Sequence, residues 1–194
     1  MKVAVIKYNA GNIQSVSFAL ERLDITFEVS SDPEIITSAD KVIFPGVGEA
    51  RTTMGHLREH KLDNLIRSLK QPTLGICLGM QLMCRYSEEY DTTCLGIFDE
   101  EVKRFVPTSD MKVPHMGWNT LTLSDSWLDP ALEKAHCYFV HSYYVPVNAS
   151  TSAITEYTTP FSAAMHRDNF YAVQFHPEKS AEAGIRVLKS FLTL

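Results

Sequence analysis

The sequence lacks a hydrophobic run long enough for a membrane span, and it lacks an excess of positive charge. A span needs about 18 apolar residues, whereas apolar stretches such as residues 42–45 and 172–175 end after a few positions. The 18 Lys and Arg residues are outnumbered by 23 Asp and Glu, for a formal net charge of -5. Because nucleic acids and anionic lipid surfaces select basic patches, we expect neither nucleic acid nor a membrane as the main partner.

Cysteine is scarce, and no pair of cysteines has the CxxC spacing of a redox or zinc motif. The four cysteines are Cys77, Cys84, Cys94 and Cys137. In a chain of 194 residues, long enough to build its own core, reduced thiols in the cytosol are the expectation. Residues 3–6 are too short for the core of a signal peptide before Lys7 interrupts them. We therefore expect a cytoplasmic protein.

Motifs for common cofactors and metals are missing as well. The sequence contains no Walker-type phosphate loop, no G-x-G-x-x-G after a predicted strand and no clustered metal-ligand spacing. Cys77, His141 and His176 could in principle share a zinc ion, but their wide separation along the chain argues against it. We expect no metal and no cofactor.

Short β-rich runs alternate with amphipathic stretches in the first half, and strand-like segments dominate the second half. The predicted strands are 2–6, 25–29, 41–44, 72–76, 96–106, 112–123, 136–145, 153–158 and 162–175. The predicted helices follow Asn12 as N-cap, open at Asp32, cover 49–70 with a break near Lys61, and cover 78–86 and 181–194. We expect one α/β domain over residues 1–194, with a mostly parallel central sheet flanked by helices and an antiparallel extension.

Residues 75–79, Gly-Ile-Cys-Leu-Gly, lie between a predicted strand and a predicted helix. This is the form of a nucleophile elbow, in which glycines permit a tight turn and the central side chain projects above the sheet. The helix N-terminus beyond the turn favours a thiolate. An isolated cysteine is more often packed as a small hydrophobe, as we expect for the other three. The glycine frame and its place between strand and helix favour Cys77 as a nucleophile.

A thiol nucleophile needs a base, and the base needs an orienting partner. His176 follows the predicted strand that ends at residue 175, and Glu178 stands two residues later. If this segment is extended, both side chains lie on one side, so Glu178 can hold one imidazole nitrogen while the other faces Cys77. Taken alone, the tripeptide is more typical of an exposed strand end with a solvated His and Glu. Its pairing with the elbow favours the catalytic interpretation.

The turn at residues 45–48, Pro-Gly-Val-Gly, follows the predicted strand 41–44 and lies at the same sheet edge as the elbow. Acyl chemistry needs donors for a developing oxyanion. We expect backbone N–H groups of Val47, Gly48 and Leu78 to supply them. Taken alone, a Pro-Gly turn is weak evidence, since most such turns only reverse the chain.

Together these elements resemble the class I glutamine amidotransferases over nearly the whole chain. The resemblance rests on Gly-Ile-Cys-Leu-Gly-Met-Gln at 75–81 and His-Pro-Glu at 176–178. It implies a flavodoxin-like fold in which Cys77 attacks the side-chain amide of L-glutamine. His176 would act as base and then acid, and Glu178 would orient it, giving a glutamyl thioester and ammonia.

The same resemblance implies a set of glutamine-binding residues. They are Gly46, Gln81, Glu89, His141, Ser142 and Tyr143. Judged from the residues alone, Gln81 and Glu89 are equally compatible with a solvated helix face. Glu88, beside Glu89, leaves open which carboxylate contacts glutamine.

Residues 114–119, Pro-His-Met-Gly-Trp-Asn, and the Gly11-Asn12 pair are similar to the glutaminase subunits of imidazole glycerol phosphate synthase. Residues 7–10 depart from that pattern, because an acidic residue and a further glycine are usual there. The resemblance implies a heterodimer in which ammonia passes to a separate (β/α)8-barrel cyclase subunit. The implied interface residues are Asn12, Met116, Trp118, Tyr138 and Lys179. Exposed Trp and Met are typical of interfaces, although a core-packed strand explains 114–119 equally well without the family.

Two other classes remain open. A cysteine peptidase or thiol hydrolase on the same fold would need an open groove, and hydrolysis of peptides rather than glutamine would reveal it. A non-catalytic redox or chaperone-like module would use Cys77 as a sensor and would not need residues 176–178. Within the amidotransferases, the glutaminase of anthranilate or aminodeoxychorismate synthesis is the nearest alternative, and it would lack the 114–119 string.

Overall fold

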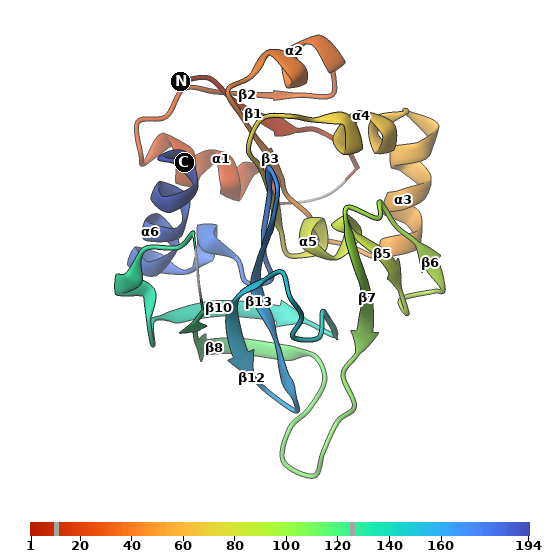
Figure 1. Cartoon of the computed structure of the whole chain (residues 1–194), viewed down its shortest axis with the longest axis vertical. Coiled ribbons are helices and arrows are strands. Elements are labelled where there is room, and N and C mark those ends of the chain that lie inside the picture. Colours follow the sequence, from red (N-terminus) through yellow and green to blue (C-terminus); the bar gives the residue numbers. More distant parts are fainter. Residues whose placement is uncertain (10–11, 125–126) are drawn as a thin grey trace.

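The computed structural model describes residues 1–9, 12–124 and 127–194, and an eight-stranded sheet forms its centre (Figure 1). The strand order is β2-β1-β3-β4-β14-β13-β12-β9, with parallel pairing from β2 to β14 and antiparallel pairing from β14 to β9. The prediction of a mostly parallel sheet with an antiparallel extension is thus confirmed. The strands are β1 (Val3–Ile6), β2 (Phe27–Ser30), β3 (Lys41–Phe44), β4 (Thr73–Ile76), β9 (Thr122–Leu123), β12 (Thr151–Glu156), β13 (Pro160–Arg167) and β14 (Phe170–Val173).

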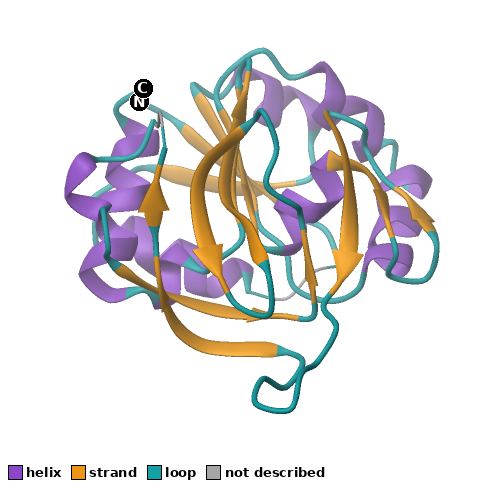
Figure 2. Ribbon diagram, turned by 60° about the horizontal axis from the view of Figure 1, so that its bottom comes forward, coloured by secondary structure: helices purple, strands orange, loops and turns teal. Residues whose placement is uncertain are grey.

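Helices cover both faces of this sheet (Figure 2). The parallel strand β1 is buried at every position because its alternating side chains enter two different cores: Ala4 and Ile6 one, Val3 and Val5 the other. The first core also takes side chains from α2 to α5, and the second from α1 and α6. The helices are α1 (Ile13–Glu21), α2 (Pro33–Ser38), α3 (Ala50–Glu59), α4 (Leu62–Ser68), α5 (Leu78–Met83) and α6 (Ala181–Leu192), with 3-10 turns η1 (Pro130–Leu132) and η2 (Pro177–Lys179).

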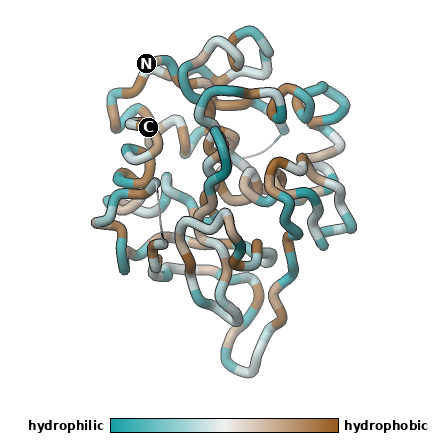
Figure 3. The backbone as a smooth tube through the Cα atoms, in the orientation of Figure 1, coloured by the Kyte–Doolittle hydropathy of each residue, from teal (hydrophilic) through white to brown (hydrophobic). Residues whose placement is uncertain are grey.

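Local sequence signals explain several of these boundaries. The Asp32 side chain accepts a hydrogen bond from the backbone N–H of Glu34, which caps α2 as predicted. Lys61, in the left-handed region with φ 58°, separates α3 from α4 at the predicted break. Along α6, hydrophobic and hydrophilic residues alternate in the tube of Figure 3, as expected of a helix with one face on the core.

Two smaller sheets complete the fold and lie to the lower and right side of Figure 1. One is the ribbon of β8 (His115–Thr120) and β10 (His136–His141). The other has the order β11-β7-β5-β6, with β5 (Cys84–Ser87), β6 (Thr92–Thr93), β7 (Phe98–Arg104) and β11 (Tyr143–Tyr144). The predicted helix over 78–86 was therefore wrong in its last turn. Residues from Cys84 onward pair with β7 instead, a long-range contact that local periodicity does not reveal.

Candidate active site

Cys77 lies between β4 and α5 in a strained backbone conformation, with φ 54° and ψ -108°. The elbow is held close to its neighbours. A Cβ atom on Gly79 would overlap the carbonyl oxygen of Phe44, so only glycine fits there. A Cβ atom on Gly75 would meet the sulfur of Met83 at 2.8 Å. The two glycines of the motif therefore let the turn pack tightly under the nucleophile, as the sequence predicts.

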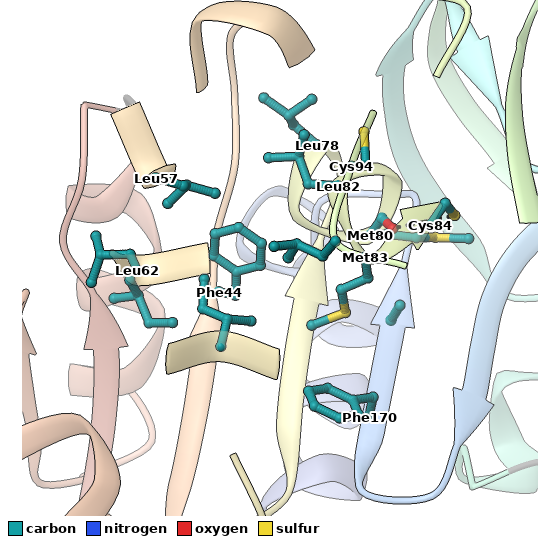
Figure 4. Packing of buried hydrophobic residues seen from close by; sticks show 14 of the residues in the cluster. Phe44, Leu57, Leu62, Leu78, Met80, Leu82, Met83, Cys84, Cys94 and Phe170 are labelled. Atoms are coloured by element: carbon teal, nitrogen blue, oxygen red, sulfur yellow. Dashed lines mark hydrogen bonds between the residues drawn. The ribbon is translucent and has the colours of Figure 1, made fainter. Parts of the chain in front are cut away.

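The helix that follows Cys77 is buried along its whole length, which anchors the elbow. Every residue of α5 is buried, and its apolar side chains join the cluster that contains Phe44 and Phe170 (Figure 4). Such close packing resists displacement of the turn. The position of Cys77 is thus determined by the core beneath it.

Cys77 differs from the other three cysteines in its surroundings. Its sulfur lines a pocket, and the side-chain amide of Gln174 donates a hydrogen bond to it at 3.7 Å. Burial raises the pKa of the Cys94 and Cys137 thiols to about 12 and that of Cys84 well above its usual range. All four thiols are free. The elbow cysteine thus lines the pocket, whereas the other three are buried thiols with raised pKa values.

His176 and Glu178 form a buried pair, with Nδ1 of the imidazole 2.7 Å from the carboxylate. Burial by itself would lower the pKa of His176, but the charge of Cys77 and the hydrogen bond to Glu178 outweigh it and raise that pKa to about 10. Among the described residues, Nε2 of His176 has no hydrogen-bond partner, and His176 lines the same pocket as Cys77. The surroundings of the ring thus favour a protonated His176.

The route from His176 to Glu178 differs from the expected extended segment. Residues 177–179 form the 3-10 turn η2, with Pro177 at its first position, where its restricted φ suits a helical turn. The turn, rather than strand alternation, brings the carboxylate back to the imidazole. The predicted pairing is present, but the predicted local geometry was wrong.

Asn12 occupies the predicted N-cap position of α1, and its side chain lies beside this pair. Its side chain makes no cap hydrogen bond; the amide nitrogen donates to Oε1 of Glu178 and lies 3.5 Å from Nδ1 of His176. The predicted N-cap position of Asn12 is confirmed, without a side-chain cap hydrogen bond, and its place in an interface stays a prediction. Ala10 and Gly11, in the divergent 7–10 segment and the Gly-Asn pair, lie outside the described residues.

The pocket in front of Cys77 measures about 320 Å³, within the range of small-ligand cavities. It brings together most of the predicted site and adds Pro114, which the sequence indicated only as part of the 114–119 string, and Val140, which it did not indicate. A hollow of about 590 Å³ lies elsewhere, between residues 127–130 and α6, and contains none of the predicted site residues. The pocket residues are Val47, Gly48, Cys77, Leu78, Gln81, Glu89, Pro114, Val140, His141, Ser142, Tyr143 and His176.

Glu89, not Glu88, lies at the pocket wall. Its carboxylate accepts a hydrogen bond from the backbone N–H of Ala50 at 2.8 Å, and burial raises its pKa although that bond opposes the shift. Glu88 instead accepts from the backbone N–H of Arg104 at 2.7 Å and does not line the pocket. The fold thus favours Glu89 over Glu88, and its contact with glutamine stays a prediction.

Gln81 and Gln174 connect the pocket wall to Cys77. Nε2 of Gln81 donates to the carbonyl of Tyr143 at 2.8 Å and to Oε1 of Gln174 at 2.9 Å. Gln174 is fully buried, and its own amide reaches Cys77. Sequence analysis missed it; the available signal was one amide within the apolar run 172–175, since a buried amide needs hydrogen-bond partners.

Residues 5–193 match the family described as Glutamine amidotransferase class-I. The chain is 63% identical over its whole length to "Imidazole glycerol phosphate synthase subunit HisH" of Bacteroides fragilis, with 100% of both chains covered. The chain belongs to the class I glutamine amidotransferases, in the HisH family. HisH of Vibrio parahaemolyticus is 43% identical, over 100% of this chain and 98% of that protein.

Solved structures agree with this family in their fold. A crystal structure of a glutamine amidotransferase superposes with a TM-score of 0.76 at 20% identity, covering 98% of this chain and 97% of the other. The crystal structure of a glutamine amidotransferase of Thermotoga maritima gives 0.63 at 14% identity, covering 100% and 83%. At these identities the likeness concerns the fold alone, and it confirms the predicted amidotransferase architecture.

The oxyanion wall of this amidotransferase differs from the expected arrangement. The backbone N–H of Leu78, a predicted donor to the oxyanion, donates to the carbonyl of Gly46 at 3.3 Å. Gly46 does not line the pocket; a Cβ there would meet the Gly79 nitrogen at 2.6 Å. Val47 and Gly48 do line it, and Gly48 has φ +123°. Gly46 thus packs against the elbow, and its predicted contact with glutamine stays a prediction.

Four of the predicted interface residues lie on β8, β10 and η2. Met116 and Trp118 on β8 are 63% and 52% exposed, and the Trp118 ring packs edge-on against Tyr138 at 5.9 Å. The Tyr138 carbonyl accepts the backbone N–H of His176, and Lys179 lies exposed on η2. The chain therefore carries large exposed apolar side chains on β8, the strand that pairs with β10, and the Tyr138 carbonyl of β10 binds the backbone of His176.

Two further observations concern surfaces away from the pocket. His56, Glu59 and His60 bring ligand atoms within 4.8 Å of one another at the end of α3. Sequence analysis missed this cluster, although the i, i+3, i+4 spacing on a helix places the three side chains together.

Among the described residues, no helix has the length and apolar character needed to cross a bilayer.

Proposed function

We propose that residues 1–194 work as a single cytoplasmic amidotransferase domain that hydrolyses L-glutamine through Cys77, His176 and Glu178. The observation that carries the proposal is the buried His176–Glu178 pair, 2.7 Å apart, in the pocket of an elbow cysteine. A thiolate with an adjacent imidazolium is the activated form of a cysteine nucleophile.

In the first half-reaction the Cys77 sulfur attacks the side-chain carbonyl carbon of glutamine. The imidazolium of His176 gives its proton to the departing nitrogen, so ammonia leaves and a glutamyl thioester remains. In the second half-reaction His176 takes a proton from water, which attacks the thioester and releases glutamate. Glu178 stabilises the imidazolium and holds its ring in place.

The pocket residues supply the remaining roles. Gln81, Glu89 and the segment His141, Ser142 and Tyr143 surround the space in front of the sulfur, and we assign them to the glutamine head group. Backbone N–H groups of Val47, Gly48 and Leu78 would stabilise the oxyanion once Leu78 is released from Gly46. No step of this mechanism requires a metal or a cofactor.

The ammonia is used by a partner. HisH subunits are named as parts of imidazole glycerol phosphate synthase, and we propose that this chain forms a heterodimer with the (β/α)8-barrel cyclase subunit of that enzyme. The surface of Asn12, Met116, Trp118, Tyr138 and Lys179 would face the cyclase. The complex would produce imidazole glycerol phosphate and aminoimidazole carboxamide ribotide in histidine biosynthesis.

The test is a glutaminase assay on the chain alone and with a cyclase partner plus its nucleotide ligand. Release of glutamate from glutamine, with no cleavage of unstructured peptides, is expected. Absence of glutamine hydrolysis in the loaded complex would contradict the proposal, and peptide cleavage would favour the peptidase interpretation.

A further inference from the structure

The strand β8 has two faces, and the proposed function uses only one of them. Met116 and Trp118 point outward, whereas His115 is buried. Its ring stacks between Tyr157, at 4.1 Å, and Phe139, at 4.9 Å. His115 does not line the pocket, yet it contacts His141, which does. Nothing in the reaction described above explains a histidine at this place.

The hydrogen bond between His115 and Asn119 shows which nitrogen of the His115 ring carries the proton. Nδ2 of Asn119 donates to the carbonyl of Glu156 at 2.8 Å, and Oδ1 of Asn119 accepts from the backbone N–H of Thr120. The orientation of the Asn119 amide is therefore set by the backbone. The same Nδ2 lies 3.3 Å from Nε2 of His115. Since Nδ2 is a donor, Nε2 of His115 must be an unprotonated acceptor.

The other end gives the same answer. Nδ1 of His141 lies 2.7 Å from the carbonyl of Tyr143, and a carbonyl can only accept, so this nitrogen carries the proton. Between the two rings, Nδ1 of His115 lies 3.2 Å from Nε2 of His141. The only consistent assignment with both rings neutral is a proton on Nδ1 of each. Burial supports neutral rings, because it lowers the pKa of His115 to about 4 and that of His141 to about 3.

The Tyr143 carbonyl is where this chain of hydrogen bonds meets the active site. This carbonyl oxygen accepts one hydrogen bond from Nδ1–H of His141 and a second from the side-chain amide of Gln81 at 2.8 Å. The amide of Gln81 also donates to Gln174, whose own amide donates to the Cys77 sulfur. Each bond fixes the direction of the next, so the orientation of the Gln81 side chain depends on that of the two rings.

We infer that His115 is a positioning residue of the glutamine pocket: through His141 it holds the Tyr143 carbonyl and the Gln81 side chain in place, with both imidazoles in the Nδ1–H form. Its effect on kinetics rests on the proposed glutaminase function, but the assignment of the protons does not. The Nε2–H form is the alternative state of each ring, and the assignment excludes it.

The first experiment is a two-bond ¹H–¹⁵N correlation spectrum of the full chain labelled with [¹⁵N]histidine at pH 7. The variants His115→Gln and His141→Gln identify the two signals. Both rings are expected to carry the proton on Nδ1. A proton on Nε2 of either ring, or a charged ring, would overturn the inference whether or not the protein hydrolyses glutamine.

The second experiment compares variants in the complex with the cyclase and its nucleotide. His115→Phe keeps a ring in the stack but removes both hydrogen bonds, so the KM for glutamine is expected to rise about tenfold with kcat within about threefold, as one buried hydrogen bond is worth roughly a factor of ten. His115→Gln, which still offers one acceptor and one donor, should recover most of the loss. Ammonium-dependent synthesis should not change.

The matched control is Phe139→Leu, which removes a stacking partner of His115 without touching a hydrogen bond. It should lower thermal stability and leave the KM unchanged. A wild-type KM for His115→Phe, or an equal rise in KM for Phe139→Leu, would show that the ring acts by packing alone and would overturn the inference. If the wild-type complex does not hydrolyse glutamine, the proposed function fails. The spectrum still shows which nitrogen of each ring carries the proton.

Discussion

The two walls of the pocket differ in how completely they are assembled. On one wall His176 and Glu178 are buried and hydrogen bonded at 2.7 Å. On the other, the backbone N–H of Leu78 is bonded to the Gly46 carbonyl, and Gly48 has a positive φ. The proposed acid–base groups are thus in contact, whereas one of the proposed oxyanion donors is occupied. From this difference we predict that a partner activates the chain at the oxyanion wall.

This difference agrees with what an ammonia-producing subunit requires. Ammonia released without a partner is lost, so hydrolysis should wait for the partner. A glycine on each side of Val47 lets the peptide plane between them rotate at low cost. One missing oxyanion donor costs about 10²–10³ in rate, which is enough to keep the isolated chain almost inactive. The triad can then remain assembled at all times.

The largest loss of glutamine-dependent activity is expected on substitution of the proposed nucleophile, Cys77, which lies between the two walls. Cys77→Ala should abolish glutamine-dependent synthesis by the complex, because no other group can form the thioester, and should leave synthesis from ammonium salts intact. Both rates are measured by product formation. Cys84→Ala is the control and should change neither. Loss of the ammonium-dependent rate in a folded Cys77→Ala complex would contradict the assignment of Cys77 to ammonia production alone.

The assembled wall is tested next. His176→Ala should reduce kcat by about 10⁴-fold or more. The loss of kcat in Glu178→Ala should be about tenfold to hundredfold smaller than that in His176→Ala, because a misoriented base keeps part of its function. Steady-state glutaminase kinetics of the complex give both values. Full activity of His176→Ala would reject the triad.

The unassembled wall should respond to the partner. The isolated chain should hydrolyse glutamine barely above background, and the cyclase with its nucleotide should stimulate it at least ~10²-fold, by completing the oxyanion hole. Trp118→Ala should weaken either the complex or the stimulation, and circular dichroism should show an intact fold. Trp118→Phe, which keeps an aromatic ring, should lose less. An isolated chain with the full rate of the loaded complex would contradict gating at this wall.

The smallest effect concerns stability and the buried rings behind the pocket. The folded pKa values of His115 and His141, about 4 and about 3, lie below the ordinary value of 6.5. The unfolded chain therefore binds more protons between these values, and the free energy of unfolding should fall as the pH drops from 6.5 toward 4. Urea unfolding at several pH values measures this slope. In His115→Gln the slope should be shallower; an unchanged slope would contradict the neutral pair.

The parallel half of the fold was predictable, because its signals are local. Continuous apolar runs mark β1, β3 and β4, and Asp32 with Pro33 marks the start of α2. The strand β5 was not predictable. Residues 84–86 continue the helical pattern of α5, and only their pairing with β7 and β6 makes them a strand. A pairing partner far along the chain decides such a segment.

The sequence by itself determined the chemistry of the site. The glycine frame specifies a turn that exposes Cys77, and the two-residue spacing places Glu178 within reach of His176, even though the turn between them is a 3-10 turn. The tertiary structure alone decided which distant groups meet: Asn12 beside Glu178, Gln174 against the sulfur, and His115 against His141, 26 residues apart. These contacts depend on strand register and packing between elements, and no local spacing of residues encodes them.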